Sequence, residues 1–308
     1  MLSFSTLAEG AAIGATAVTI GKFDGVHRGH QALIQELISA ARERDLKTVL
    51  VTFDRHPDAL LNPARLKWPL IGPTQKTALV AEAGVDAMLT LSFDENLANQ
   101  SAEAFIQETL VDALDAKLVI VGEDFRFGAG GAGDVSLLHD LGRQLGFDVR
   151  VIPSATVAGL KVSTSAIRDL LDLGDVTSAA QLLGRVHTNV GVIEHGLKIG
   201  RTIGFPTANM SRNAEGYLPL DGVYAGWLVA DGVRYPAAHS VGINETFQAV
   251  PRLVESHVLD RKDLDLYDKV VTLEYIEFIR PSAKFDGVES LVEEINRDLD
   301  KIRIILGL

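Results

Sequence analysis

Residues 21–30 have the sequence GKFDGVHRGH and stand between an apolar, β-rich run, Ala17–Ile20, and a segment with helical periodicity, Gln31–Arg44. Glycines at these places let the backbone turn tightly and approach a ligand closely. The start of a helix carries unpaired N–H groups and the positive end of the helix dipole, which together attract phosphate. The stretch therefore predicts a strand–turn–helix unit with an anion site at its turn.

The same alternation of strands and helices continues through the first half of the chain. Strands are predicted at Ala17–Ile20, Lys47–Phe53, Ala87–Leu91, Lys117–Val121 and Asp148–Ile152. Helices are predicted between them at Gln31–Arg44, Thr74–Ala83, Ser101–Leu114 and Val135–Leu145. This order predicts an α/β domain with a parallel, Rossmann-like sheet that has helices on both faces and binds ligands at the carboxyl ends of its strands.

The second half of the chain has a different pattern. Two short helical segments, Ser165–Leu171 and Val176–Leu183, are followed by strand and turn signals from Thr188 to Ile279. An Asp231-Gly232 pair between apolar runs indicates a hairpin, and a helix with one apolar stripe starts near Val288. We expect a small antiparallel β-barrel with a terminal helix. The predicted domains are residues 1–184 and 185–308.

The composition of the chain excludes several classes of function and partner. The chain has 308 residues, a formal net charge of -12 and no cysteine. The acidity argues against general nucleic-acid binding, and the lack of cysteine excludes disulfides, thiol catalysis and Cys-ligated metals. The apolar start has no basic residue before Lys22, and no run is long enough to span a bilayer. We expect a cytoplasmic protein with no membrane or nucleic-acid partner. The formation of a homo-oligomer is compatible with the sequence.

Two histidines occupy the predicted turn. His27 and His30 are three residues apart at the start of a helix, so they share a face. Two imidazoles there can donate hydrogen bonds to a reacting phosphorus centre and stabilise charge in the transition state. A metal site is less favoured, because no third ligand is evident and the spacing differs from that of H-E-x-x-H.

The turn resembles known enzymes. His-x-Gly-His after a first strand is typical of nucleotidyltransferases that transfer AMP or CMP, and GKFDGVHRGH is similar to the adenylyltransferase module of bacterial bifunctional riboflavin kinase/FAD synthetases. The resemblance extends to FDRHP at 53–57, VGEDFRFG at 121–128 and STSAIR at 163–168. It implies ATP contacts from Gly21, Phe23, Asp24 and Gly25, and phosphate contacts opposite the turn from Ser163, Thr164, Ser165 and Arg168. It also implies a nucleotide and flavin pocket bordered by Asp124 and Phe125.

A second match in this region is misleading. Residues 128–133 fit G-x-G-x-x-G, but they belong to a long loop that starts at Gly122 rather than to a tight turn after the first strand. We expect a mobile loop over a pocket there, not a dinucleotide site.

The stretch GRTIGFPTAN, residues 200–209, indicates a second site. Thr207 and Asn209 offer neutral oxygens on one side of an extended segment, which Mg²⁺ accepts together with nucleotide phosphates. Gly200 and Gly204 permit close passage of a phosphate chain. The string is closely similar to the riboflavin kinase signature, and that resemblance places Arg201 with the ATP phosphates and Asn244 in the flavin pocket.

A kinase that acts on an alcohol benefits from a base. The strand VESHVLD, residues 254–260, contains Glu255, which matches the catalytic glutamate that takes the riboflavin 5′-hydroxyl proton in the family. His257 is the competitor, because it lies two residues along and points to the same face.

Three departures from the family pattern accompany these matches. Glu245 follows Asn244 where proline is usual, Asp268 follows Tyr267 where glycine is usual, and Arg55 replaces a common proline. The resemblance implies ATP-dependent phosphorylation of riboflavin to FMN and adenylylation of FMN by ATP to FAD and pyrophosphate, with Mg²⁺. The alternatives are an adenylyltransferase with a weakened kinase, because of Glu245, and a non-catalytic flavin or nucleotide sensor.

Overall fold

The computed structural model describes residues 1–65, 67–195, 200, 203–242, 252–261 and 263–308. The chain forms two compact units. The first contains Met1–Pro69 and Pro73–Val162, and the second contains Leu70–Gly72 and Ser163–Leu308. Residues 163–184, predicted as the end of the first domain, thus group with the second unit, and a domain boundary near Gly184 stays a prediction.

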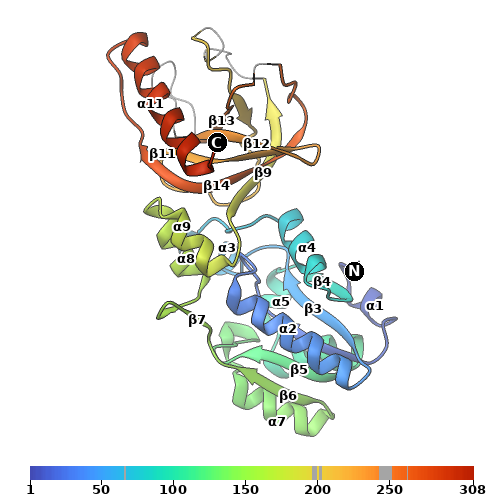
Figure 1. The fold of residues 1–308 in the computed structure, drawn as a ribbon. Helices are drawn as coiled ribbons and strands as arrows, with labels where there is room; N and C mark the ends of the chain where they lie inside the picture. The colour runs from blue at the N-terminus through green and yellow to red at the C-terminus, as the bar shows by residue number, and fades with distance from the viewer. Residues whose placement is uncertain (66, 196–199, 201–202, 243–251, 262) are drawn as a thin grey trace. The chain divides into compact units, whose positions relative to one another are not determined.

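The first unit contains a parallel sheet of six strands in the order β1-β4-β3-β2-β5-β6 (Figure 1). The strands are β1 (Leu2–Phe4), β2 (Thr16–Ile20), β3 (Lys47–Phe53), β4 (Ala87–Leu91), β5 (Ala116–Gly122) and β6 (Asp148–Ile152). All residues of β2 are buried, as expected for a central parallel strand with both faces covered. The strand order reverses between β2 and β5, and a crevice for ligands forms at such a point, beyond the carboxyl ends of the strands.

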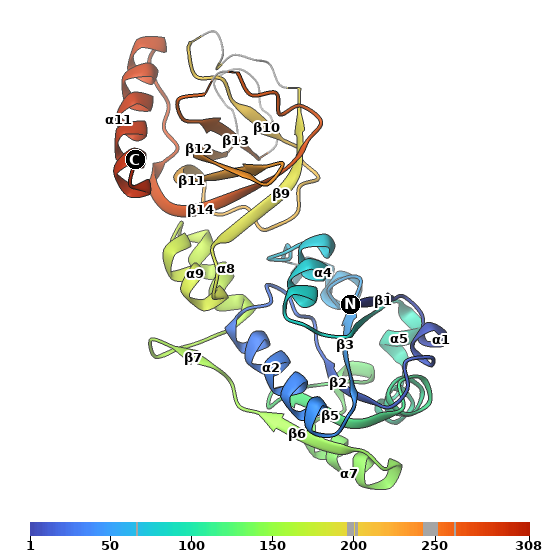
Figure 2. The same cartoon turned by 45° about the vertical axis from the view of Figure 1, so that its right-hand side comes forward.

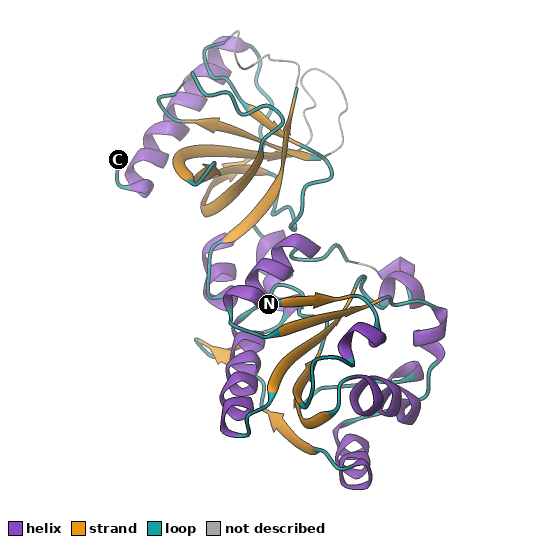
Figure 3. Cartoon of the chain, turned by 90° about the vertical axis from the view of Figure 1, so that its right-hand side faces the viewer, coloured by secondary structure: helices purple, strands orange, loops and turns teal. Residues whose placement is uncertain are grey.

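Helices cover both faces of this sheet, as predicted (Figures 2 and 3). The first long helix, α2 (Arg28–Glu43), packs against β2, β3 and β5. The predicted helix 101–114 begins as α6 (Ala102–Phe105) and continues as a π-helix, η2 (Ile106–Ala113), which contacts α7 (Val135–Leu145). The other elements are α1 (Leu7–Gly10), α3 (Asp58–Leu61), η1 (Pro63–Arg65), α4 (Pro73–Glu82), α5 (Glu95–Asn99), η3 (Ala129–Gly131), β7 (Thr156–Val157) and β8 (Leu160–Lys161).

The second unit contains a closed barrel in the order β10-β13-β12-β11-β14-β9. Its strands are β9 (His187–Glu194), β10 (Ala208–Met210), β11 (Gly222–Ala230), β12 (Val233–Gly242), β13 (Leu253–Val258) and β14 (Val270–Pro281). Asp231 and Gly232 form the predicted hairpin turn, with φ of 50° and 76°. The terminal helix α11 (Val288–Leu306) packs on β11, β12 and β14, while α8 (Thr164–Asp172) and α9 (Val176–Leu183) precede the barrel.

Candidate active sites

The turn between β2 and α2 has an unusual backbone. Phe23, Gly25 and Val26 have positive φ values of 48°, 90° and 39°. Such values are rare for Phe and Val, and the surrounding structure must hold them. The Val26 N–H donates to the Phe23 carbonyl at 3.3 Å, and Gln31 Nε2 donates to the Val26 carbonyl at 2.8 Å. The turn is therefore held in one conformation by its own hydrogen bonds and by α2.

The two histidines of this turn contact each other. His27 caps α2, and its Nδ1 accepts a hydrogen bond from the His30 N–H at 3.3 Å. The two rings are stacked with centroids 3.7 Å apart, and the His30 ring also contacts Phe23 at 5.0 Å. Burial and the charges of His27 and Lys76 hold the pKa of His30 well below its ordinary value. His30 is therefore neutral near pH 7, and its buried Nδ1 has no hydrogen-bond partner in the described part of the chain.

Lys76 on α4 also belongs to this site, although no sequence motif indicated it. Its Nζ donates to the Lys22 carbonyl at 2.9 Å and to Thr52 Oγ1 at 3.3 Å. Burial lowers the pKa of Lys76, while the negative charge of Asp24 raises it. Asp24 itself is only 6% exposed. A carboxylate and an ammonium thus lie at the turn that carries the histidines.

Asp124 and Phe125 follow the adjacent strand, β5. Because β2 and β5 pair in parallel, both residues come after the strand edge at which the His27 turn lies. Phe125 stacks on Phe127 with centroids 5.4 Å apart. Asp124 is exposed and forms an ion pair with Lys161 at 2.7 Å.

The loop at 128–133 is closed by backbone hydrogen bonds at its two ends. Phe127 and Gly133 exchange two backbone hydrogen bonds, at 3.1 and 2.9 Å. Gly128 has φ of 73°, and a Cβ there would lie 2.6 Å from backbone atoms of Ala102. These contacts close the segment into a short turn against α6, and the mobility of the loop stays a prediction.

Ser163, Thr164, Ser165 and Arg168 lie at the start of α8, in the second unit. The Ser163 hydroxyl caps the helix by accepting the Ala166 N–H at 3.2 Å. Arg168 is only 5% exposed, and its guanidinium lies over the ring of Tyr217, 5.7 Å from the centroid. The Tyr217 hydroxyl donates to Asp172 at 2.6 Å. Contacts within the second unit thus orient Arg168.

Three oxygen-bearing side chains come together at the barrel. The Thr207 hydroxyl donates to Glu255 Oε2 at 3.1 Å. Asn209 on β10 lies directly opposite Glu255 on β13 in the antiparallel pair. Cross-strand partners have their side chains on the same face of a sheet. Thr207, Asn209 and Glu255, separated in the sequence, therefore form one cluster.

His257 lies on the same face of β13 as Glu255 but has a different contact. Its Nδ1 donates to the Pro206 carbonyl at 2.8 Å, and its ring meets the Phe205 ring edge to face at 5.6 Å. The imidazole thus supports the segment that carries Thr207.

The glycines of the 200–209 stretch have tight surroundings. The Phe205 N–H donates to the Gly200 carbonyl at 2.8 Å, and a Cβ on Gly200 would lie 2.3 Å from the Phe205 carbonyl oxygen. Gly204 has φ of 94°. Two predicted site residues, Arg201 and Asn244, lie outside the described residues, as does Glu245.

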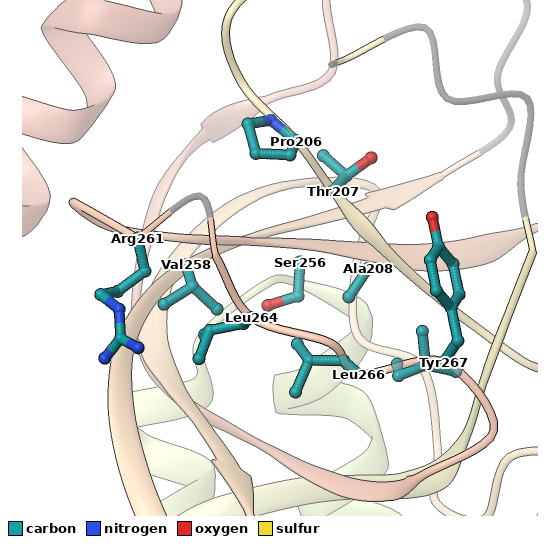
Figure 4. A pocket seen from close by; sticks show the side chains of 10 residues that line it. Pro206, Thr207, Ala208, Ser256, Val258, Arg261, Leu264, Leu266 and Tyr267 are labelled. Carbon is teal, nitrogen blue, oxygen red and sulfur yellow. The ribbon is translucent and has the colours of Figure 1, made fainter.

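A small pocket with a cavity volume of about 50 Å³ adjoins the cluster (Figure 4). Thr207, Ser256, Arg261 and Tyr267 line it together with apolar side chains. The Tyr267 ring stacks on His195 with centroids 4.0 Å apart. Asp268, which replaces a common glycine, has φ of 61°, a left-handed conformation that Asp tolerates better than most residues. The backbone at Asp268 thus keeps a conformation that suits glycine.

The described ranges contain no group of three or more His, Cys, Asp or Glu side chains that could hold a metal ion. They also contain no helix that is long and apolar enough to cross a membrane.

Known proteins are similar to both units. The FAD synthetase family model matches residues 11–166, and the riboflavin kinase family model matches residues 183–306. A bifunctional riboflavin kinase/FMN adenylyltransferase from Escherichia coli K12 is 36% identical over 292 residues, which cover 94% of this chain and 93% of that protein. The Listeria monocytogenes protein of that name is 35% identical over 285 residues, covering 91% and 89%.

A solved structure is similar over nearly the whole chain. It is described as a macrolide-efflux protein from Streptococcus pneumoniae and has a TM-score of 0.88 with 30% identity. The match covers 98% of this chain and 99% of the other.

Proposed function

This chain belongs to the family of bifunctional riboflavin kinases/FMN adenylyltransferases, and on that premise we propose which residues carry each of its two reactions. One reaction transfers the γ-phosphoryl group of ATP to riboflavin and gives FMN and ADP. The other transfers the adenylyl group of ATP to FMN and gives FAD and pyrophosphate. The two family models match separate parts of the chain, so the two reactions are assigned to different sites.

Adenylyl transfer is assigned to the His27 turn. An oxygen of the FMN phosphate attacks the α-phosphorus of ATP, and pyrophosphate leaves as the bond to the β-phosphate oxygen breaks. The free N–H groups at the start of α2 attract the phosphates, and His27 and His30 donate hydrogen bonds to oxygens that gain charge. The observation that supports this assignment is the stacked His27–His30 pair at a helix N-terminus, beside the strand-order reversal.

Phosphoryl transfer is assigned to the barrel cluster. Glu255 takes the proton of the riboflavin 5′-hydroxyl while its oxygen attacks the γ-phosphorus of ATP and ADP leaves. The hydrogen bond from Thr207 orients the Glu255 carboxylate. The support for this role is the cross-strand placement of Glu255 opposite Asn209.

The same cluster fits a magnesium ion. Thr207 donates its proton to Glu255, so lone pairs of Oγ1 remain for a cation, and Asn209 adds an amide oxygen. A Mg²⁺ ion that is bound together with nucleotide phosphates typically has only a small number of protein ligands. We assign Thr207 and Asn209 as its protein ligands. When bound, the ion neutralises charge on the phosphate oxygens of ATP.

A product time course tests both reactions. The protein is incubated with riboflavin, ATP and Mg²⁺, and FMN and FAD are separated by chromatography. FMN should appear first and FAD should follow. If FMN were the final product, the protein would have kinase activity alone. If FAD formed only from supplied FMN, the protein would have adenylyltransferase activity alone. Unchanged flavin would contradict both and favour a sensor.

A further inference from the structure

The ammonium of Lys76 connects three segments of the first unit. It donates to the Lys22 carbonyl at 2.9 Å and to Thr52 Oγ1 at 3.3 Å. The Thr52 hydroxyl in turn donates to the same Lys22 carbonyl at 3.2 Å. Helix α4, the end of β3 and the turn after β2 therefore meet at one carbonyl oxygen.

This carbonyl has a special place in the backbone. The Lys22–Phe23 peptide plane sets φ of Phe23, which has the rare value of 48°. Val26, in the same turn, has φ of 39°. Strained conformations persist only when their surroundings hold them. Two hydrogen bonds to the Lys22 carbonyl hold the first strained peptide of the turn.

The charge of Lys76 also reaches the titrating groups of the turn. Asp24 attracts the ammonium, and burial, the charge of His27 and the positive charge of Lys76 together lower the pKa of His30. A half-buried ammonium is costly to desolvate unless it is paired and hydrogen-bonded. Lys76 has both kinds of partner. The side chain of Lys22, in contrast, is exposed.

We propose that Lys76 is a positioning residue for adenylyl transfer, which holds the Lys22 carbonyl so that residues 23–30 keep the conformation that receives phosphate. The proposal rests on the assignment of that reaction to His27 and His30. The lysine does not touch the reacting atoms. It acts through the backbone of the turn and through the neutral state of His30.

The test compares K76M with K117M. Lys117 lies in the same unit, is exposed and pairs with Asp115, so K117M controls for loss of a lysine. FAD formation is measured from supplied FMN and ATP, and FMN formation is measured in the same samples as an internal control for folding. K76M should lower kcat for FAD formation by about 10- to 100-fold, since small misplacements of reacting groups cost that much. FMN formation should stay within about twofold, and K117M should change neither activity.

The pH profile separates positioning from a purely structural role. Loss of the positive charge raises the pKa of His30, because the protonated ring is then less repelled. The limb of the pH–rate profile of FAD formation that follows the protonation of His30 should therefore move to higher pH in K76M. The limb should keep its place in K76R, which retains a charge.

Three outcomes would overturn the proposal: FAD formation by K76M at the wild-type rate, equal loss of both activities, or an unshifted limb. H27A separates the assignment of the site from the role of Lys76. Wild-type FAD formation by H27A would remove the site assignment itself, whereas inactive H27A with fully active K76M would remove only the role of Lys76.

Discussion

The Thr207 hydroxyl donates a hydrogen bond to Glu255 at 3.1 Å, although the two residues are 48 positions apart in the chain. The antiparallel register of β10 and β13, which places Asn209 opposite Glu255, makes this contact possible. Strand pairing thus brings together the proposed general base and the two proposed oxygen ligands of a cation. Each of these side chains can be tested separately, because the other reaction of the enzyme serves as an internal control.

Glu255→Gln should slow FMN formation by about 10²- to 10⁴-fold, the usual contribution of a general base. The amide keeps the shape of the side chain but cannot take the hydroxyl proton. FAD formation from supplied FMN should be preserved. E277Q, which changes an exposed glutamate of β14, is the matched control. FMN formation by E255Q at the wild-type rate would exclude Glu255 as the base.

Thr207→Val should raise the Mg²⁺ concentration needed for FMN formation and lower kcat by about 10-fold or more, because the variant loses one metal ligand and one hydrogen bond to a carboxylate. Thr207→Ser keeps the hydroxyl and should stay near wild type. The measurement is a Mg²⁺ titration of the kinase rate at saturating ATP and riboflavin. Identical titration curves for the valine and serine variants would contradict the metal assignment.

His27→Ala should lower FAD formation by about 10²- to 10³-fold while FMN accumulates from riboflavin, because one donor to the developing charge is removed. His139 on α7 is exposed, so H139A is the matched control. Both products are quantified in one chromatogram. Loss of FMN as well as FAD would show that the two reactions are not independent.

The barrel should lose stability as the pH falls from about 6.5 toward 4. Burial lowers the pKa of His187 and of His239 from 6.5 to about 4. Between these values the unfolded chain binds protons that the folded chain does not. The contribution of the two histidines to the free energy of unfolding is therefore fully present above pH 6.5 and is lost as the pH falls below it. Each histidine should contribute about 1.4 kcal/mol per pH unit in this window.

The fluorescence of Trp227, in a Trp68→Phe background, follows this unfolding, since the chain has two tryptophans and Trp227 lies on β11. The neutral ring of His239 is held between Ser256 at 2.9 Å and the Glu274 carbonyl at 3.2 Å. His239→Gln should flatten the pH dependence even if it lowers stability overall. An unchanged slope in H239Q would exclude His239 as a source of the effect.

Much of the fold follows from local signals. The predicted strands Lys47–Phe53, Ala87–Leu91 and Asp148–Ile152 and the predicted helices Val135–Leu145 and Val176–Leu183 have the bounds found in the structure. Their apolar periodicity lies within the segments themselves, and caps such as Asp134 and Gly184 stand directly beside them. Strand β1 was missed because its three residues are too few for a pattern. The π-helical turns after Phe105 were missed because their apolar spacing resembles that of an α-helix.

Several predictions are not tested by the fold or by the relatives. The roles of Arg201 and Asn244 and the effect of Glu245 concern residues outside the described ranges. The cytoplasmic location, the oligomeric state and the absence of nucleic-acid partners also stay predictions.

Local patterns in the sequence established the two chemistries and the groups of site residues that lie close together in the chain. His27 and His30 share a helix start, and Thr207 and Asn209 share an extended segment, because both relationships depend only on local backbone geometry. The tertiary structure alone decided that Lys76 reaches the Lys22 carbonyl, that Arg168 lies on Tyr217 and that Thr207 donates to Glu255. These contacts depend on helix packing and strand register, which hydrophobic burial sets over the whole domain and which no short segment encodes.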